Sequence, residues 1–252
     1  MNTTVEISAT IVLYKEDVET LQKTIDSFLK TPLSKKLYLI DNSPTNKLQN
    51  HFLDPAIEYR FVGKNSGFGA AHNLVINEIQ GSSKYHLILN PDVIFESEVL
   101  LKLKKELDNH KEIAMVSPKV IYPDGKLQYT CRKYPTFLEL IYRRFGVFKK
   151  FTQKQEYRDE HLIKSFYPNF FQGCFLLFNT ADFVAINGFD ERYFLYMEDV
   201  DICKKIDKQG KRKMYFPGTE IVHNHRRGSS QKIILLFHHI SSAIKYFKKW
   251  KN

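Results

Sequence analysis

The stretch Tyr85-His-Leu-Ile-Leu-Asn-Pro-Asp92 decides the fold, because it joins a short apolar strand directly to a polar turn. Its first five residues are a mostly apolar run bounded by a turn signal, which is typical of a buried strand. Pro91 cannot donate a hydrogen bond to a neighbouring strand, so it ends the strand and leaves the Asp92 carboxylate available to a ligand. The same arrangement recurs at Leu37–Ile40, which is followed by Asp41-Asn-Ser-Pro44. A lone carboxylate in such a turn is more often a turn former, but two at neighbouring strand ends favour a ligand site.

Further strands and helices alternate along the first half of the chain. Strands are predicted at Ile7–Tyr14, Ile57–Val62 and Ile113–Ser117, and helices at Val18–Leu29, Phe68–Ile79 and residues 97–109, with Asp17 and Ser97 as N-caps. This alternation predicts an α/β fold with a mainly parallel sheet flanked by helices and a ligand site at the carboxyl ends of the strands. The alternation then stops, and it resumes with a strand at Phe170–Phe178, a helix capped near Thr180 and another at Glu198–Gln209.

Composition restricts the class of protein. Of the 252 residues, 43% are hydrophobic and 14% aromatic, which is enough to bury a core and argues against a disordered chain. One α/β domain with a small appendage fits this length better than two domains. No apolar run comes near the roughly 20 residues that cross a bilayer, and the N-terminal segment is read as a first strand rather than a signal peptide. The cysteines, Cys131, Cys174 and Cys203, are too widely spaced for a disulfide framework or metal knuckle and predict a reducing cytosol.

The net charge of +10 is concentrated in two basic stretches. One runs from Arg132 to Lys150 and includes several aromatic residues, and the other follows Glu220, after which the sequence has no acid. Basic clusters attract the phosphates of nucleotides, anionic lipids or nucleic acids, although a solvated surface explains a single cluster equally well. A nucleic-acid-binding protein is therefore one alternative. It leaves the clustered carboxylates without a purpose, because they would repel a phosphate backbone.

Residues 231–252 have the pattern of a basic amphipathic helix. The apolar positions at helical spacing are Ile233, Leu236, Phe237, Ile240, Ile244 and Phe247, and the other side carries His238, Ser241, Ser242, Lys245 and Lys249. Such a helix suits the interface of a membrane with water. A helix docked on the core of its own domain is the alternative that the pattern leaves open.

Three acids crowd the start of the predicted helix at Glu198–Gln209: Glu198, Asp199 and Asp201. Acids at a helix N-terminus complement the helix dipole, which is the simpler explanation. An acid beside apolar residues can also have its pKa raised and serve as a base near neutral pH. Downstream, His223 and His225 share one side of a predicted strand and could meet a metal, although a surface or core pair fits this spacing as well.

A glycine-bearing turn, Gly63–Asn73, precedes the helix predicted at Phe68–Ile79. Its small residues allow close approach of the backbone, and the helix that follows offers unpaired N–H groups to an anion. The turn is neither a Walker A loop nor a complete dinucleotide-binding motif. A glycine turn before a helix is also ordinary architecture, so this segment alone decides nothing.

Taken in order, these motifs resemble family 2 glycosyltransferases, and most closely the bacterial rhamnosyltransferase-like branch that builds cell-surface polysaccharides. The resemblance covers nearly the whole chain, least at residues 130–165. The motifs that carry it are Ala9–Tyr14, Leu39-Ile-Asp41-Asn-Ser, Asn65-Ser-Gly67-Phe-Gly69 with Asn73, Leu89-Asn-Pro-Asp92, Gly188-Phe-Asp190-Glu191, Tyr196-Met-Glu-Asp199-Val-Asp201 and His223 with Gly228-Ser-Ser.

The resemblance implies a GT-A fold at residues 1–230, with a nucleotide-binding half at 1–120 and an acceptor and catalytic half at 121–230. It implies inverting transfer of a sugar from a nucleotide-diphosphate donor, with L-rhamnose from dTDP-L-rhamnose as a candidate. The acceptor would be a lipid-linked glycan in O-antigen, capsule or cell-wall synthesis. The enzyme would be cytoplasmic and peripheral on the inner face of the bacterial plasma membrane. A retaining or hydrolytic carbohydrate enzyme remains a second alternative, and it would need two carboxylates at one bond.

The resemblance also implies roles for single residues. Thr10 and Asp41 would border the base pocket, and Asn65, Gly67, Gly69 and Asn73 would line the nucleotide. Asp92 would be the last acid of the DXD motif that holds Mg²⁺ or Mn²⁺, with His223 or His225 completing the metal site; Asn90 stands where many relatives carry the first acid. Asp199 would be the catalytic base, and Gly173 and Glu198 would lie near the acceptor. Apart from the resemblance, Arg226 and Arg227 are candidates to clamp the diphosphate, and surface cations explain them equally well.

Overall fold

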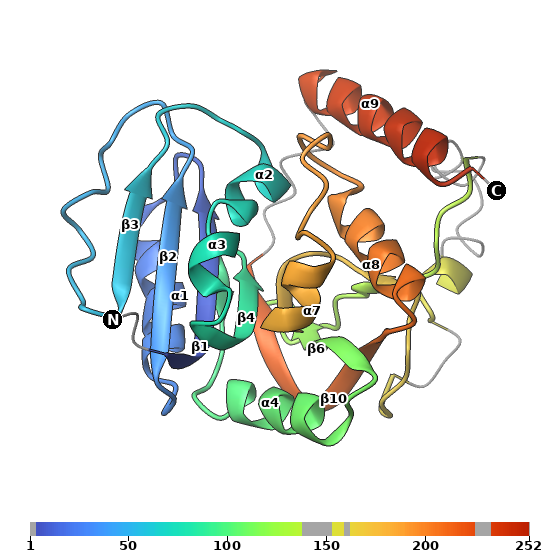
Figure 1. Ribbon diagram of the computed structural model, residues 1–252, viewed down its shortest axis with the longest axis horizontal. Helices are drawn as coiled ribbons and strands as arrows, with labels where there is room; N and C mark the ends of the chain where they lie inside the picture. The colour runs from blue at the N-terminus through green and yellow to red at the C-terminus, as the bar shows by residue number, and fades with distance from the viewer. Residues whose placement is uncertain (1–3, 138–152, 159–161, 225–232, 252) are drawn as a thin grey trace.

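The computed structural model describes residues 4–137, 153–158, 162–224 and 233–251. Within these ranges the chain forms an eight-stranded sheet in the order β3-β2-β1-β4-β9-β6-β10-β5 and a two-stranded sheet of β7 and β8 (Figure 1). The strands are β1 (Val5–Leu13), β2 (Lys35–Asp41), β3 (Ile57–Phe61), β4 (Ser83–Leu89), β5 (Val93–Ile94), β6 (Ile113–Ile121), β7 (Cys131–Arg132), β8 (Phe170–Phe171), β9 (Phe175–Asn179) and β10 (Arg212–His223).

The first half of the sheet is parallel, as the alternation of strands and helices predicts. Strands β3, β2, β1 and β4 all run in the same direction. Strand β9 then enters antiparallel between β4 and β6, and β10 runs parallel to β6. The predicted strand Phe170–Phe178 is therefore two strands, β8 and β9, because the chain changes sheets at Gln172–Cys174.

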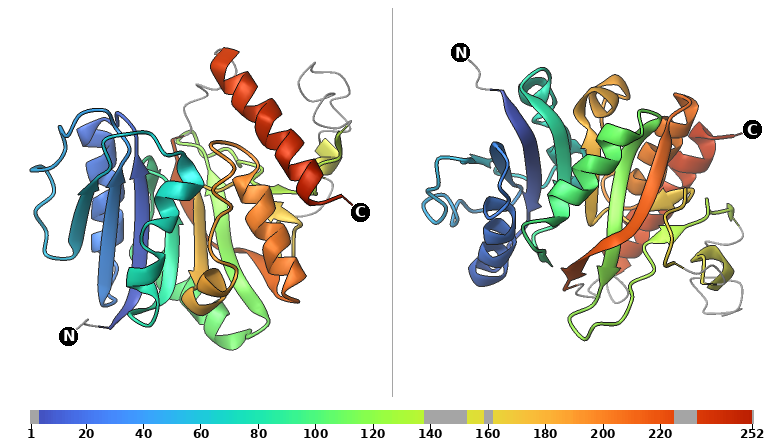
Figure 2. Two further views of the ribbon diagram at one scale, coloured as in Figure 1. Left: turned by 45° about the horizontal axis from the view of Figure 1, so that its top comes forward. Right: turned by 90° about the horizontal axis from the view of Figure 1, so that it is seen from below.

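Helices cover both faces of the large sheet (Figures 1 and 2). Helices α1 (Val18–Leu29) and α4 (Val99–Asn109) belong to the core on one face. The core on the other face contains residues of α2 (Phe68–Asn73), α3 (Ile76–Ile79), α7 (Thr180–Ala185), α8 (Glu198–Lys208) and α9 (Ile233–Lys249). No helix in the described ranges has the length and apolar character needed to span a bilayer.

The predicted helix boundaries have mixed outcomes. The Asp17 carboxylate accepts hydrogen bonds from the backbone and hydroxyl of Thr20, which confirms it as the cap of α1. Ser97 is not a cap, because α4 begins one residue later than such a cap requires and makes no side-chain cap bond. The single helix predicted at Phe68–Ile79 is broken into α2 and α3, and at the break the Leu74 carbonyl accepts a hydrogen bond from Arg60.

Helix α9 packs on the protein through its buried residues Ser242, Ala243 and Tyr246. Ser242 is buried and donates a hydrogen bond to the Leu195 carbonyl, and His238 stacks on Phe194 with ring centroids 4.5 Å apart. On the outer side, Ile233 is 74% exposed and Phe237 66% exposed. The alternative of a helix docked on its own domain is therefore confirmed, and binding of its exposed apolar side chains to a membrane stays a prediction.

Candidate active site

A cavity of about 860 Å³ opens at the carboxyl end of β4. Its walls come from segments far apart in the sequence: Phe68, Asn90, residues 122, 126–130 and 132, Glu156 and Arg158, residues 172–174, residues 195, 196, 198 and 199, His223 and Leu235. Five residues that the sequence predicted for the site line this one cavity: Asn90, Gly173, Glu198, Asp199 and His223. The fold therefore brings the predicted catalytic base and the predicted metal-binding edge of the sheet into one space.

Asp199 is the second residue of α8, which follows a strained turn. Tyr196 and Met197 both have positive φ values, 68° and 70°, in the left-handed region that side-chain-bearing residues rarely adopt. This turn places Asp199 beside Gly173, where a Cβ added to the glycine would lie 3.6 Å from the Cβ of Asp199. Paired left-handed residues store strain of the kind that clusters at functional sites. Their position directly before the acids supports a functional role for Asp199.

Glu198 is the buried member of the acidic pair. The residue is only 7% exposed, and within the described residues its Oε2 atom has no hydrogen-bond partner. Burial, and then the negative charge of Asp199, raise the pKa of Glu198 to about 8. Two adjacent carboxyls resist ionising together. Near neutral pH Glu198 therefore holds a proton, and Asp199 is left as the candidate base.

Asp92 does not itself line the cavity, but it contacts His223, which does. The Nε2 atom of His223 lies 3.3 Å from Oδ1 of Asp92, and Gln128 holds the other ring nitrogen at 3.0 Å. Burial lowers the pKa of His223, but the neighbouring Cys174 and Asp92 raise it more, to about 10. Among the described residues no three metal-binding side chains cluster into a complete site. His225, Arg226 and Arg227 lie outside the described residues.

Asp41 lies in a second, smaller pocket of about 490 Å³, together with Lys15, Ser43 and Lys47. Its buried carboxylate accepts hydrogen bonds from the Ser43 backbone at 2.8 Å and the Tyr59 hydroxyl at 2.6 Å. Asp41 therefore lines a pocket at the end of β2, and its role at the base stays a prediction.

Thr10, the other residue predicted for the base pocket, lies in the core. It is fully buried in the middle of β1, where its hydroxyl pairs with Nε2 of His86 at 3.2 Å, and it lines neither pocket. The placement of Thr10 at the base pocket is therefore wrong, because its side chain is enclosed within the packed sheet and reaches neither cavity.

The glycine turn packs against the loop that carries the acids. A Cβ on Gly67, whose φ is +91°, would lie 2.5 Å from the Phe194 carbonyl oxygen, and one on Gly69 would lie 2.8 Å from the Cβ of Phe189. Asn73 bonds both the N–H and the carbonyl of Phe189 at 2.9 Å. The close approach that the glycines allow is thus to residues 189–194.

Asn65 belongs to the same arrangement, because its side chain accepts a hydrogen bond from the Gly67 N–H at 3.0 Å. None of Asn65, Gly67, Gly69 and Asn73 lines either pocket. In this structure these residues position the loop before α8. The hydrogen bonds that they make are to the protein itself, and not to the region of either pocket. The glycines in the sequence indicated a close approach to the backbone here, but they could not show that the approaching group is the loop before α8.

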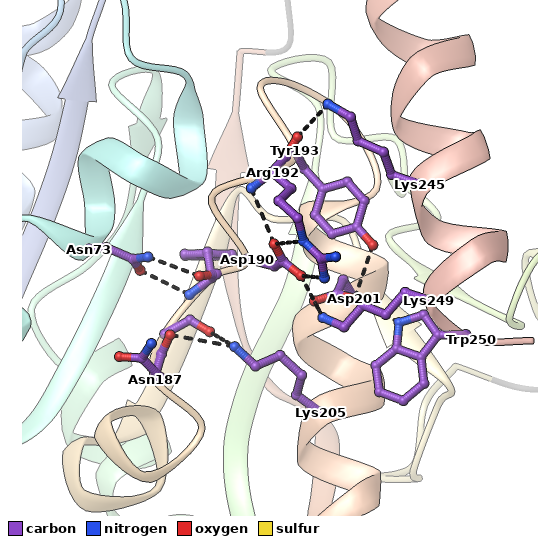
Figure 3. Close-up of polar contacts among 12 residues, drawn as sticks. Asn73, Asn187, Asp190, Arg192, Tyr193, Asp201, Lys205, Lys245, Lys249 and Trp250 are labelled. Carbon is purple, nitrogen blue, oxygen red and sulfur yellow. Dashed lines mark hydrogen bonds and ion pairs between the residues drawn. The ribbon is translucent and has the colours of Figure 1, made fainter.

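Asp201, the third acid, is an anchor for α9 rather than part of the cavity (Figure 3). It is fully buried and accepts hydrogen bonds from Lys249 at 2.8 Å, the Trp250 indole at 2.6 Å and the Tyr193 hydroxyl at 3.2 Å. Lys249 also bonds Asp190 at 2.7 Å. Sequence reasoning missed this role because the partners lie 48 and 49 residues further along the chain.

Comparison with known proteins identifies the family. The sequence profile described as Glycosyl transferase family 2 matches residues 8–183, and that of the N-terminal domain of galactosyltransferase matches residues 157–227. Because the first match spans more than half of the sequence, the chain belongs to glycosyl transferase family 2. Rhamnosyltransferase WbbL of Escherichia coli K12 is 27% identical over 192 residues, which cover 73% of this chain and 70% of that protein.

A second relative is the N-acetylglucosaminyl-diphospho-decaprenol L-rhamnosyltransferase of Mycobacterium tuberculosis, 28% identical over 218 residues, or 81% of this chain and 70% of that protein. Among solved structures, GalNAc-T7 with UDP, GalNAc and Mn²⁺ matches with a TM-score of 0.65 at 14% identity, over 89% of this chain and 44% of that one. The mannosyltransferase PcManGT of Pyrobaculum calidifontis, with GDP-Man and Mn²⁺, matches with a TM-score of 0.63 at 14% identity, over 98% and 65%. This chain spans less than two thirds of both solved chains, and the likeness confirms the GT-A-type fold.

Proposed function

We propose that this protein transfers a sugar from a nucleotide-diphosphate donor to a lipid-linked glycan acceptor in polysaccharide synthesis, with inversion at the anomeric carbon. The observation that carries the proposal is that Asp199, Glu198, Asn90 and His223 line one cavity. The names of two relatives support L-rhamnose as the sugar and a diphosphate-linked lipid as part of the acceptor.

In this mechanism Asp199 removes the proton from the acceptor hydroxyl as that oxygen attacks the anomeric carbon. The nucleoside diphosphate leaves from the opposite face, so one displacement inverts the anomeric configuration. One general base suffices for such a step and contributes about 10²–10⁴-fold in rate. Glu198, which holds its proton near neutral pH, can donate a hydrogen bond to the acceptor without competing as a base.

The residues present fit a divalent ion that is held only in part by the protein. Mg²⁺ in phosphate-binding sites is commonly bound by one or two carboxylates together with substrate oxygens and water. Asp92 offers such a carboxylate, and its neighbour Asn90 lines the cavity. When bound, Mg²⁺ or Mn²⁺ neutralises charge that develops on the departing diphosphate. His223 orients Asp92 through their 3.3 Å contact, and the pocket around Asp41 is proposed to receive the base.

We place the enzyme on the cytoplasmic face of the plasma membrane through α9. The apolar stripe of this helix points away from the protein, with Ile240 and Ile244 exposed beside Phe237. Exposed lysines follow in the last turns, at Lys245 and Lys248. An outward apolar stripe next to cations is the arrangement that binds an anionic bilayer surface.

The experiment is a transfer assay with a panel of nucleotide sugars that includes dTDP-L-rhamnose, a polyprenyl-diphosphate sugar as acceptor, and Mg²⁺ or Mn²⁺. We expect one donor to give product with inverted anomeric configuration, read by NMR. In thermal shifts, a donor at 100 times its Kd should add about 2.7 kcal/mol of stability. Asp92→Ala should remove the metal-dependent part of this gain. A retained configuration, or a gain that metal and Asp92→Ala leave unchanged, contradicts the proposal.

A further inference from the structure

The mechanism leaves one wall of the cavity unused. This cationic wall consists of Lys126, Arg132, Glu156 and Arg158, which come from the excursion between β6 and β8. Arg132 is 8% exposed and pairs with Glu156 at 2.9 Å, while Arg158 pairs with the other Glu156 oxygen at 2.6 Å. These four side chains carry three positive charges and one negative charge, so the wall has a net positive charge.

The two guanidinium groups are held in fixed positions. Arg158 lies over the Tyr129 ring, 4.2 Å from its centroid, and the Glu156 carboxylate between the two arginines is buried. Lys126, by contrast, is exposed and pairs with Asp124. Planar guanidinium groups that are already oriented suit bidentate binding of phosphate oxygens, because little rotamer freedom is lost on binding.

The segment between β8 and β9 connects the parts of the cavity. The Cys174 carbonyl accepts a hydrogen bond from the Asn90 N–H at 3.0 Å, at the proposed metal end. Its neighbour Gly173 contacts Asp199, the proposed base. The Gln172 N–H then donates to the Thr130 carbonyl at 3.0 Å, and Arg132 pairs with Phe170 in the small sheet. Gln128, two residues before Thr130, also bonds the ring and the carbonyl of His223, so the cationic wall adjoins both the base and the proposed metal end.

The cavity is also bordered by the proposed membrane helix. Leu235, in the first turn of α9, lines the same cavity as Arg158, and Ile234 next to it is exposed on the outer surface. A molecule with one end at the cationic wall and an apolar tail could thus pass from the cavity along α9.

We propose that the cationic wall binds the diphosphate that links the acceptor sugar to its lipid. The inference rests on the proposed function and assigns Arg132 and Arg158 to the acceptor rather than to the donor. The observation that favours the lipid-linked diphosphate over that of the donor is the apolar start of α9 beside the wall, where Leu235 lines the cavity and Ile234 is exposed.

The test is calorimetric titration of the full chain with farnesyl diphosphate in EDTA, where no metal can hold a diphosphate at Asp92. We expect the wild type to bind and Arg158→Ala to bind at least tenfold more weakly. Arg132→Lys keeps the positive charge beside buried Glu156 but loses the planar guanidinium group, so it should also weaken binding. Arg212→Ala is the matched control, because Arg212 lies over the Tyr167 ring at 3.9 Å at the opposite end of β10 from His223, and it should bind as the wild type does.

Three results would overturn the inference: no binding of farnesyl diphosphate by the wild type, equal loss in the control variant, or equally tight binding of inorganic pyrophosphate, which would indicate a phosphate site without lipid recognition. In the transfer assay, Arg158→Ala should raise the acceptor KM and leave the donor KM unchanged; a rise confined to the donor KM would also overturn it. Farnesyl diphosphate binding that depends on Arg158, with no transfer from any donor, would support the wall and refute the proposed function.

Discussion

Replacement of Asp201 by alanine should loosen α9 and destabilise the protein. Asp201 is fully buried and accepts hydrogen bonds from Lys249, Trp250 and Tyr193. Removing one partner of a buried ion pair typically costs about 3–5 kcal/mol, but Lys249 retains its bond to Asp190 at 2.7 Å. We therefore expect a loss of about 3 kcal/mol in the free energy of unfolding. For a chain of this size that corresponds to a fall in Tm of about 9 °C.

The assay is urea and thermal unfolding of Asp201→Ala, Asp201→Asn and the control Glu220→Ala. Asparagine keeps one acceptor oxygen but loses the charge, so its loss should be about half that of alanine. Glu220 pairs with Lys119 at 2.8 Å on the surface, where such a pair contributes about 0–1 kcal/mol. If Asp201→Ala unfolds within about 2 °C of the wild type, or no lower than Glu220→Ala, the role of Asp201 as anchor of α9 is refuted.

Three other perturbations test separate parts of the structure. Because the pKa of Glu198 is raised from 4.5 to about 8 in the folded state, the free energy of unfolding of the wild type should decline relative to that of Glu198→Gln as pH rises from 4.5 to 8. Urea unfolding of both proteins at pH 5, 7 and 9 measures this difference, and a difference that does not change with pH would contradict the prediction. Gly67→Ala should lower the free energy of unfolding by more than about 2 kcal/mol, because the added Cβ would meet the Phe194 carbonyl. The control Gly210→Ala, where φ is +73° but the surrounding space is open, should lower it by about 1 kcal/mol. Equal losses in chemical denaturation would show that packing of Gly67 against the loop is unimportant. Phe237→Ser should weaken the binding of the protein to anionic vesicles about tenfold. Leu53→Ser, which changes a similarly exposed residue outside α9, should leave vesicle binding unchanged. Equal effects of the two variants in vesicle sedimentation would exclude membrane binding by the exposed apolar side chains of α9.

The sequence predicts best the features that neighbouring residues determine. The strands before Asp41 and Asn90 are short apolar runs that end at turn residues, and both occur where expected. The Asp17 cap depends only on a residue three positions away, so it was also predictable. The antiparallel entry of β9 between β4 and β6 was not, because pairing partners in a sheet are chosen by the whole chain.

Roles within the site depend on distant partners and were harder to predict. Glu198, Asp199 and Asp201 stand together in the sequence, yet burial, the cavity and α9 give each a different environment. Arg132 was visible only as part of a basic stretch, and its ion-pair partner Glu156 lies far from it in the sequence. Burial and pairing of these charges follow from the folded chain rather than from their spacing.

The most direct test of the account is the turnover of Asp199→Asn, measured with the donor dissociation constant of the same variant. Glu98→Gln, which removes an acid from the start of α4 outside the cavity, is the matched control. The account predicts that Asp199→Asn lowers kcat at least about a hundredfold while donor affinity stays within about twofold, because only the proton acceptor is lost. A variant that keeps most of its turnover, or that loses donor affinity as much as turnover, would contradict the assignment of Asp199 as the base.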